Sequence, residues 1–209
     1  MIIKVIRLKT VGIFTRIDIL NNKEIFYIPS DIYNKLKDKV NIILIPLSKN
    51  DTFDIVEERL NLCNGIILPG GDDIYPLEID VCKYLYEKDI PLLGICLGMQ
   101  TMAYAMGGTM DRLPNLNHKS EKEYAHMVKI MPNTNLAKLI RRPQIMVNSR
   151  HKDYIATCSN LQISAYSEDG IIEAIEEKNK KFFIGVQWHP ENLKDENTNR
   201  LFRYFINML

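Results

Sequence analysis

A cysteine stands at a sharp predicted turn in the segment PLLGICLGMQ, residues 91–100. An apolar strand is predicted to end at Ile95 and a helix to begin directly after Cys96, with a glycine two residues to either side of the cysteine. This spacing is the cysteine counterpart of the serine nucleophile elbow. The free amides of the first helical turn favour a thiolate, and the amide of Leu97 could donate to an oxyanion. We therefore interpret Cys96 as a candidate nucleophile, although a buried strand followed by an ordinary helix would also account for the glycines.

A histidine and a glutamate near the C-terminus could act together with this cysteine. The segment FFIGVQWHPE, residues 182–191, reads as a strand that ends just before His189, with Glu191 two residues further on. The carboxyl ends of parallel strands meet at one edge of an α/β sheet, so the strands before Cys96 and His189 can bring the two side chains together. A lone histidine is more often structural, but here Glu191 could orient the imidazole and stabilise its charged form. The three residues predict a catalytic triad in which His189 moves the proton.

A glycine turn, LPGGDD at residues 68–73, follows another predicted strand. Its glycines could turn a backbone amide toward a developing negative charge. We predict that the amides of Gly71 and Leu97 form an oxyanion hole, with Gly70 beside the substrate. Without the other motifs, the same residues would be interpreted as an ordinary glycine turn.

The elements that must position these residues follow from the hydrophobic pattern. Short apolar runs alternate with amphipathic stretches in the first half of the chain, which predicts crossover units and a mainly parallel sheet. The expected strands are residues 4–8, 11–15, 41–46, 65–68 and 91–95, and the expected helices are residues 29–39, 51–60, 76–87, 97–106 and 196–209. Between residues 124 and 188, alternating and β-branched runs suggest antiparallel or mixed strands added to the sheet. Residues 114–122 are polar and weakly periodic, and we expect them to be the most mobile segment.

The composition fits one domain that spans residues 1–209. Hydrophobic residues make up 46% of the chain, enough for a sizeable core, and the formal net charge is only +1. This balance gives no reason to expect a nucleic-acid or membrane partner, and no apolar run approaches the ~20 residues of a membrane span. The N-terminus is too short and too charged for a signal peptide, so we expect a cytoplasmic protein. Because the four cysteines have no zinc-type spacing, we expect free thiols and no zinc site built on them. Nucleophilic chemistry at Cys96 needs no metal and no organic cofactor, so we expect neither.

Taken together, these motifs resemble those of the class I glutamine amidotransferase family, because GICLGMQ is paired with VQWHPE. Within it the chain is most similar to the free-standing γ-glutamyl hydrolase branch, peptidase C26, which includes γ-glutamyl-γ-aminobutyrate hydrolase. The closer match lies in LPGGDDIYP, VNSRH and SEDGIIEAIE, and in the histidine of AHMVKI. The resemblance implies a flavodoxin-like three-layer α/β sandwich with a mainly parallel central sheet. It also implies Cys96 as nucleophile, His189 as base, Glu191 as its orienting carboxylate, and Gly71 and Leu97 at the oxyanion hole.

The polar segment VNSRH, residues 147–151, is expected to hold the α-amino and α-carboxylate groups of a glutamyl substrate. Its candidate contacts are Asn148, Ser149, Arg150 and His151, and a surface loop is the plainer interpretation. Gln100 lies one helical turn past the candidate nucleophile. The resemblance places it at the glutamyl end of the pocket as well.

The reaction that the resemblance implies is cleavage of the γ-glutamyl C–N bond of a small compound through a glutamyl thioester. The leaving amine is encoded in no motif, because the regions that would shape its pocket, up to about residue 40 and from 108 to 126, match the branch weakly or are compact. Candidate substrates are γ-glutamyl-γ-aminobutyrate and γ-glutamyl-CDP-amidate, the substrate of a compact relative from bacterial capsule phosphoramidate synthesis. The residues that could meet a phosphate are Arg16, Arg150, His151 and Lys152, although ordinary solvated charge explains them equally.

Two alternative functions stay open. A glutaminase subunit would pass ammonia to a synthase; the chain contains no synthase domain, so that partner would be a separate protein, and we do not favour it. A non-catalytic regulatory protein on the same fold would be expected to lack part of the triad, whereas all three residues are present here. The sequence predicts no oligomeric state.

Overall fold

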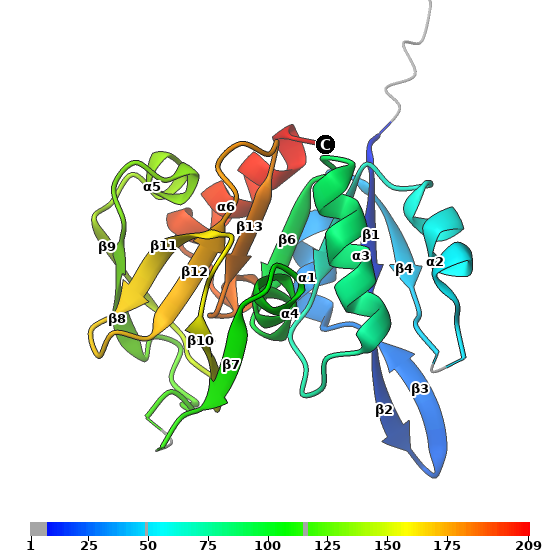
Figure 1. Cartoon of the computed structure of the whole chain (residues 1–209), viewed down its shortest axis with the longest axis horizontal. Helices are drawn as coiled ribbons and strands as arrows, with labels where there is room; N and C mark the ends of the chain where they lie inside the picture. The colour runs from blue at the N-terminus through cyan, green and yellow to red at the C-terminus, as the bar shows by residue number, and fades with distance from the viewer. Residues whose placement is uncertain (1–7, 49, 115–116) are drawn as a thin grey trace, which may run out of the picture.

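A nine-stranded sheet with helices on both faces forms the body of the molecule (Figure 1). The computed structural model describes residues 8–48, 50–114 and 117–209. The strand order is β4-β1-β5-β6-β13-β12-β11-β8-β9. Side chains from α1, α5 and α6 build the hydrophobic core on one face, and side chains from α2, α3 and α4 build it on the other. The fold is therefore the three-layer α/β sandwich that the sequence predicts.

The sheet has a parallel half and an antiparallel half. The parallel strands are β4 (Asn41–Ile45), β1 (Thr10–Phe14), β5 (Gly65–Leu68), β6 (Leu92–Ile95) and β13 (Phe183–Val186). The antiparallel strands are β12 (Ile172–Glu176), β11 (Gln162–Ser167), β8 (His126–Ile130) and β9 (Gln144–Val147). The antiparallel strands expected between residues 124 and 188 are confirmed, and the last strand of that region, β13, joins the parallel half beside β6.

The helices pack on the sheet through their buried side chains, and α4 is buried along almost its whole length. They are α1 (Ser30–Leu36), α2 (Phe53–Leu60), α3 (Pro76–Glu87), α4 (Leu97–Ala105), α5 (Asn135–Ile140) and α6 (Glu196–Asn207), with a short 3₁₀ turn, η1 (Pro190–Asn192). In α6, Leu201, Phe202 and Phe205 are buried, and the carboxylate of Asp195 accepts hydrogen bonds from the first free amides of the helix. All five predicted helices are present, and α5 is an addition that the sequence did not predict.

Two small sheets flank the large one. Strands β2 (Arg16–Leu20) and β3 (Lys23–Tyr27) form a hairpin that projects beyond the main sheet (Figure 1). Asn21 and Asn22 close it with φ values of 52° and 60°, a turn that suits the right-handed twist of a hairpin. The second pair is β7 (Thr109–Arg112) with β10 (Asp153–Thr157). Neither pair was predicted, and the strand predicted at residues 4–8 falls almost wholly outside the described residues.

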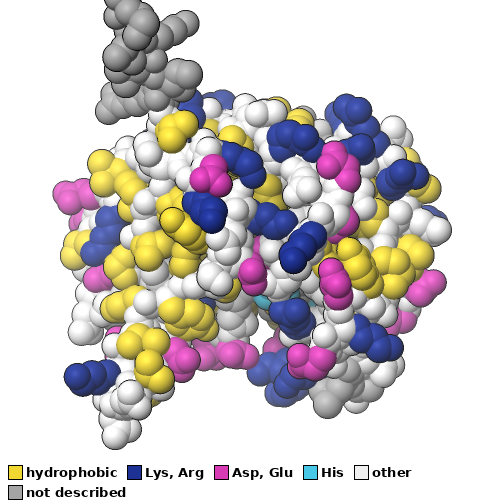
Figure 2. All heavy atoms as spheres, turned by 180° about the vertical axis from the view of Figure 1, so that it is seen from behind, with side chains coloured by type: hydrophobic (Ala, Val, Ile, Leu, Met, Phe, Trp, Pro, Cys, Tyr) yellow, Lys and Arg dark blue, Asp and Glu magenta, His cyan; other side chains and the backbone are white. Residues whose placement is uncertain are grey.

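The charges on the surface and the lengths of the helices relate to the expectations about nucleic-acid and membrane partners, and burial relates to the segment expected to be mobile. On the face seen in Figure 2, acidic and basic side chains are interspersed and neither sign forms a continuous field. None of the helices in the described part of the chain has the length and apolar character needed to cross a membrane. In the segment expected to be mobile, residues 115 and 116 lie outside the described residues, whereas His118 is buried and only 3% exposed.

The carboxyl ends of the parallel strands meet at one edge of the sheet. Leu68 at the end of β5 pairs with Gly94 in β6, and Ile95 at the end of β6 pairs with Val186 at the end of β13. The residues that follow these strands are the glycine turn, Cys96 and His189. Because ligands bind outside the carboxyl ends of parallel strands, this edge is where the candidate site must lie.

Candidate active site

The three predicted triad residues come together at this edge. His189 Nδ1 lies 2.7 Å from Glu191 Oε1, and the imidazole is close enough to Cys96 for the two side chains to interact. Burial lowers the pKa of His189, but the interactions with Cys96 and Glu191 outweigh it and raise the pKa from 6.5 to about 10. The surroundings therefore favour the imidazolium form of His189 beside Cys96.

Cys96 has the backbone of a nucleophile elbow. Its φ and ψ are 51° and −106°, in the region that residues with a side chain rarely adopt, and α4 begins at the next residue. The amide of Cys96 donates to the carbonyl of Val186 at 2.8 Å, which ties the elbow to the strand that leads to His189. A Cβ atom at Gly98 would lie 2.1 Å from the carbonyl oxygen of Leu68, so only glycine lets α4 approach β5 this closely. The elbow thus depends on close backbone packing between neighbouring elements.

A buried arginine holds the glycine turn. Arg16, at the start of the hairpin, donates from Nη2 to the carbonyl of Pro69 at 2.6 Å and from Nε to the carbonyl of Gly70 at 3.0 Å. Its Nη1 lies 2.5 Å from Glu78 Oε1, and both side chains are almost wholly buried. This corrects the expectation that Arg16 is a free cation for a phosphate, because its guanidinium is already committed to the turn. Fixing the carbonyls of the turn also fixes the direction in which its amides point.

Two amide side chains support the triad. Asn148 Nδ2 donates to the carbonyl of His189 at 2.8 Å, and the amide of His189 donates to Asn148 Oδ1 at 2.7 Å. Gln187 is fully buried and donates from Nε2 toward Cys96 Sγ at 3.5 Å, while its Oε1 accepts from Gln100 Nε2 at 3.1 Å. These contacts fix the backbone of His189 and the thiol of Cys96 in position at the ends of β6, β9 and β13.

Two adjoining pockets open at the site. The smaller, of about 90 Å³, lies beside Cys96 and Leu97, and its charged lining residues are Asp72, Lys119, Arg150, Lys152 and Asp153. The larger, of about 560 Å³, shares Leu97 and Gln100 with it and extends toward Ile79 and Tyr104. The pocket next to the thiol is therefore small and charged, and the one beyond it is roomy and more apolar.

The site can now be compared with known proteins. The Peptidase C26 family matches residues 77–191, which include all three triad residues. A glutamine amidotransferase-like protein of Rickettsia prowazekii is 32% identical, over 78% of this chain and 82% of its own. The chain belongs to the peptidase C26 family. Anthranilate synthase component 2 of Cyanophora paradoxa is also 32% identical, over 80% of this chain and 87% of its own.

Solved structures agree with this family assignment at the level of the fold. A GMP synthase-like protein from Thermoplasma acidophilum has a TM-score of 0.73 and 21% identity, over 97% of this chain and 94% of that one. Membership of the peptidase C26 family, with its glutamine amidotransferase-like relatives, supports a hydrolase that acts on amide bonds.

The structure sorts the predicted substrate residues of this peptidase C26 protein into two groups. Gly71, Gln100, Arg150 and His151 line the pocket beside Cys96, and Gly70 lies against the ring of His189. The side chains of Asn148 and Ser149 instead hydrogen-bond with the protein backbone. Asn148 Nδ2 donates to the carbonyl of His189, and Ser149 Oγ donates to the carbonyl of His118 at 2.7 Å. These two therefore position the loop before β10 rather than face a substrate. His151 is only 4% exposed, and its ring nitrogen Nε2 points toward Glu173.

Four residues near the site were missed or misassigned from the sequence. Arg16 and Glu78 form the buried pair that holds the glycine turn, Gln187 contacts the thiol, and His118 anchors Ser149. Gln187 could have been found, because it directly follows β13 and stands two residues before His189. Arg16 and His118 lie far from the motifs in sequence, and Glu78 follows the glycine-turn segment LPGGDDIYP by two residues. These three residues reach their partners only through the packing of the hairpin, α3 and the segment before β8.

Breaking the buried pair should destabilise the protein and disturb the site. We expect Arg16→Met to cost about 3–5 kcal/mol of unfolding free energy, because Glu78 would be left buried without its partner. The double variant Arg16→Met/Glu78→Leu should recover most of that stability in urea unfolding, yet keep a reduced kcat because Pro69 and Gly70 remain unanchored. A double variant with the full wild-type kcat would show that Arg16 does not position the turn.

The carboxylate of Glu191 should set the pH range in which His189 is protonated. In Glu191→Gln the pKa of His189 should fall below about 10, because the negative charge that stabilises the imidazolium is lost. The imidazolium is the acid that protonates the leaving amine, so activity is present below this pKa and lost as the pH rises through it. The alkaline limb of the kcat profile should therefore move at least one pH unit lower in the variant. An unmoved limb would contradict this assignment, and the imidazole signals in NMR spectra provide an independent reading.

Proposed function

We propose that this protein hydrolyses the γ-glutamyl C–N bond of a small amide through a thioester on Cys96. The observation that carries the proposal is the arrangement of buried Cys96 and Glu191 on either side of the partly buried His189 at the ends of β6 and β13. Attack of the thiolate on the γ-carbonyl carbon forms a tetrahedral oxyanion, which the amides of Leu97 and Gly71 would stabilise. His189 gives its proton to the leaving nitrogen as the C–N bond breaks, then takes a proton from the water that hydrolyses the thioester. The products are glutamate and the free amine.

The two pockets support a binding mode in which the glutamyl group and the leaving group of the substrate occupy separate pockets. The small pocket carries Lys119, Arg150 and Lys152 beside the thiol, and these cations suit the α-carboxylate of a glutamyl group, with Asp72 and Asp153 near its α-ammonium. Arg150 is further positioned by a 2.6 Å hydrogen bond from Nη1 to Asn192 Oδ1. The γ-carbonyl would then face Cys96 and the leaving group would extend into the larger pocket.

The larger pocket supports a leaving group bigger than ammonia. Its volume of about 560 Å³ is in the range that accommodates a drug-sized molecule, more than γ-aminobutyrate needs. Its charged lining residues are Arg112 and three carboxylates, Asp72, Asp111 and Asp153, so a phosphate would find a cation only at Arg112. On the volume of this pocket, we favour a nucleotide-linked γ-glutamyl amidate over γ-glutamyl-γ-aminobutyrate as the substrate class.

A panel assay for glutamate release tests this function. The purified protein alone is offered glutamine, γ-glutamyl-γ-aminobutyrate, γ-glutamyl dipeptides and a nucleotide-linked γ-glutamyl amidate at equal concentrations. We expect kcat/KM to be highest for the amidate and at least about 100-fold lower for glutamine, because ammonia leaves the larger pocket unfilled. The variant Met110→Trp, which narrows that pocket without adding a charge, should lower kcat/KM for the amidate and leave it unchanged for glutamine.

A glutaminase subunit is the second candidate function. It is favoured by the 32% identity to anthranilate synthase component 2, a relative named as one part of a larger enzyme. Under this alternative, glutamine would be the best substrate in the panel and its turnover would stay slow until a synthase partner is added. Steady turnover of a γ-glutamyl amide by the protein alone would exclude it.

A further inference from the structure

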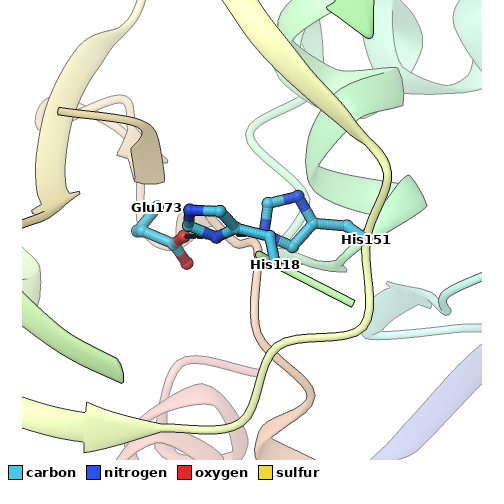
Figure 3. Close-up of side chains that lie close together, drawn as sticks. All are labelled: His118, His151 and Glu173. Atoms are coloured by element: carbon cyan, nitrogen blue, oxygen red, sulfur yellow. Dashed lines mark ion pairs between the residues drawn. The ribbon is translucent and has the colours of Figure 1, made fainter. Parts of the chain in front are cut away.

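Three imidazole rings surround one buried carboxylate next to the candidate active site. Glu173 in β12 is fully buried, and its Oε1 lies 3.5 Å from His118 Nδ1, 3.5 Å from His126 Nε2 and 3.6 Å from His151 Nε2. Figure 3 shows the rings of His118 and His151 lying close to this carboxylate. The four residues come from different segments: the chain before β8, the first residue of β8, the loop before β10, and β12. None of them belongs to the triad.

The outer nitrogen of each ring already donates a hydrogen bond. His118 Nε2 lies 3.0 Å from a carboxylate oxygen of Asp169, and His151 Nδ1 lies 3.0 Å from the carbonyl of Asp153. His126 Nδ1 lies 3.3 Å from the carbonyl of Met127. Carbonyl and carboxylate oxygens only accept, so in each case the ring nitrogen carries the hydrogen. In a neutral ring the inner nitrogen then presents a lone pair toward Glu173.

These inner lone pairs and the carboxylate have no donor among the described residues. The inner nitrogens of His126 and His151 and both oxygens of Glu173 make no hydrogen bond within the described part of the chain. Ser149 Oγ lies 3.3 Å from the inner nitrogen of His118, but its hydrogen goes to the carbonyl of His118. Four acceptors facing one another in a buried site repel each other unless a cation lies between them.

We propose that His118 Nδ1, His126 Nε2, His151 Nε2 and a carboxylate oxygen of Glu173 form a binding site for one zinc ion. Zinc bonds of about 2.0–2.1 Å in a tetrahedral site place neighbouring ligand atoms roughly 3.3 Å apart. The three separations from Oε1 exceed this by only a few tenths of an ångström, and the ligand atoms of His118, His151 and Glu173 all lie within 4.8 Å of one another. His126 Nε2 lies 3.5 Å from Glu173 Oε1 but outside that group of three, so its ring has to move further than the others to complete the site.

The charge and the surrounding hydrogen bonds fit this assignment. Zn²⁺ with three neutral imidazoles and one carboxylate carries a charge of +1, which the nearby Asp169 balances. A carboxylate or carbonyl that accepts from the outer nitrogen of a ligating histidine is the usual second partner in zinc sites, because it fixes the tautomer. With four protein ligands the site would be closed, so its role would be structural. It would cross-link the antiparallel half of the sheet to the loop that carries Asn148, which holds His189.

Metal analysis tests the proposal on the full chain without a histidine tag. Protein purified without chelators should contain close to one zinc per chain, and after chelation it should rebind one Zn²⁺ with a Kd below about 1 μM in competition with a chromophoric chelator. Added Zn²⁺ should raise the thermal midpoint of the chelated protein. A chain that holds no zinc and is not stabilised by Zn²⁺ would overturn the proposal in favour of an ion-free cluster of imidazolium groups around Glu173.

Substitutions test whether the zinc ion binds in this cluster. Glu173→Gln and His126→Gln should weaken zinc binding at least about 100-fold, and Asp169→Asn, at an exposed side chain outside the ligand set, should weaken it about 10–100-fold. The matched controls Cys96→Ser and His189→Asn remove the thiol and the imidazole of the triad, which lie outside the proposed ligand set. They should leave the Kd for zinc unchanged. If Glu173→Gln does not fold, the zinc affinity of the Asp169→Asn variant still shows whether the ion binds in this cluster. Zinc binding that is lost in Cys96→Ser and unchanged in His126→Gln and Asp169→Asn would overturn the proposal.

Discussion

Replacing Cys96 by alanine or serine should abolish glutamate release from every substrate that the wild-type protein hydrolyses. We expect kcat to fall at least about 10⁴-fold, because the thiolate forms the bond on which both halves of the proposed reaction depend. The fold should survive, since the change removes or replaces one atom at a position where the backbone is held by the Val186 carbonyl and by α4. Circular dichroism and a thermal midpoint within a few degrees of the wild type would verify this.

A chemical control separates loss of catalysis from loss of binding. A glutamine-like electrophile should add its mass to wild-type protein at a single site, and peptide mapping should place it on Cys96. The alanine variant should take up no label, while Cys158→Ala, which removes a half-buried thiol away from the site, should be labelled like the wild type. Glutamate release that persists in Cys96→Ala would contradict the mechanism. Failure of the wild type to react would favour the non-catalytic alternative.

Substituting alanine at Gly98 should cause a large loss of stability. The added Cβ would lie 2.1 Å from the carbonyl oxygen and 2.8 Å from the carbonyl carbon of Leu68. These are backbone atoms of a buried strand that cannot rotate away, so α4 must separate from β5. We expect a cost of at least about 3 kcal/mol in unfolding free energy, at the upper end of overpacking effects, or failure to accumulate as folded protein.

Gly170 offers a matched control for this substitution. Its φ of 86° disfavours a side chain, but nothing lies within 4 Å of the added Cβ. Gly170→Ala should therefore cost only about 1–2 kcal/mol, from backbone strain without a clash. Urea unfolding of both variants measures the difference. Equal costs at the two positions would show that the close approach of α4 to β5 does not account for the glycine in the elbow motif.

Local patterns along the chain were enough to predict a large part of this protein. The strands and helices around β5, β6, α3 and α4 follow from hydrophobic periodicity, and Cys96, His189 and Glu191 follow from their places at strand ends. In a parallel sheet the strand ends must share an edge, so a residue placed directly after a strand has a predictable position. The hairpin of β2 and β3 was not predicted because its side chains are largely exposed, and their pattern therefore carries no information about burial.

Contacts between distant segments determine which polar residues face the substrate and which face the protein. Arg16 looked like a free cation, but the hairpin and α3 place it against Glu78 and the carbonyls of the glycine turn. Asn148 looked like a substrate contact, yet its amide both donates to and accepts from the backbone of His189. The histidines around Glu173 come from separate segments, so neither the spacing of the cysteines nor the chemistry of Cys96, on which the expectation of no metal rested, had any bearing on them. Hydrogen-bond partners and burial arise only when the chain has folded, and a linear pattern does not specify them.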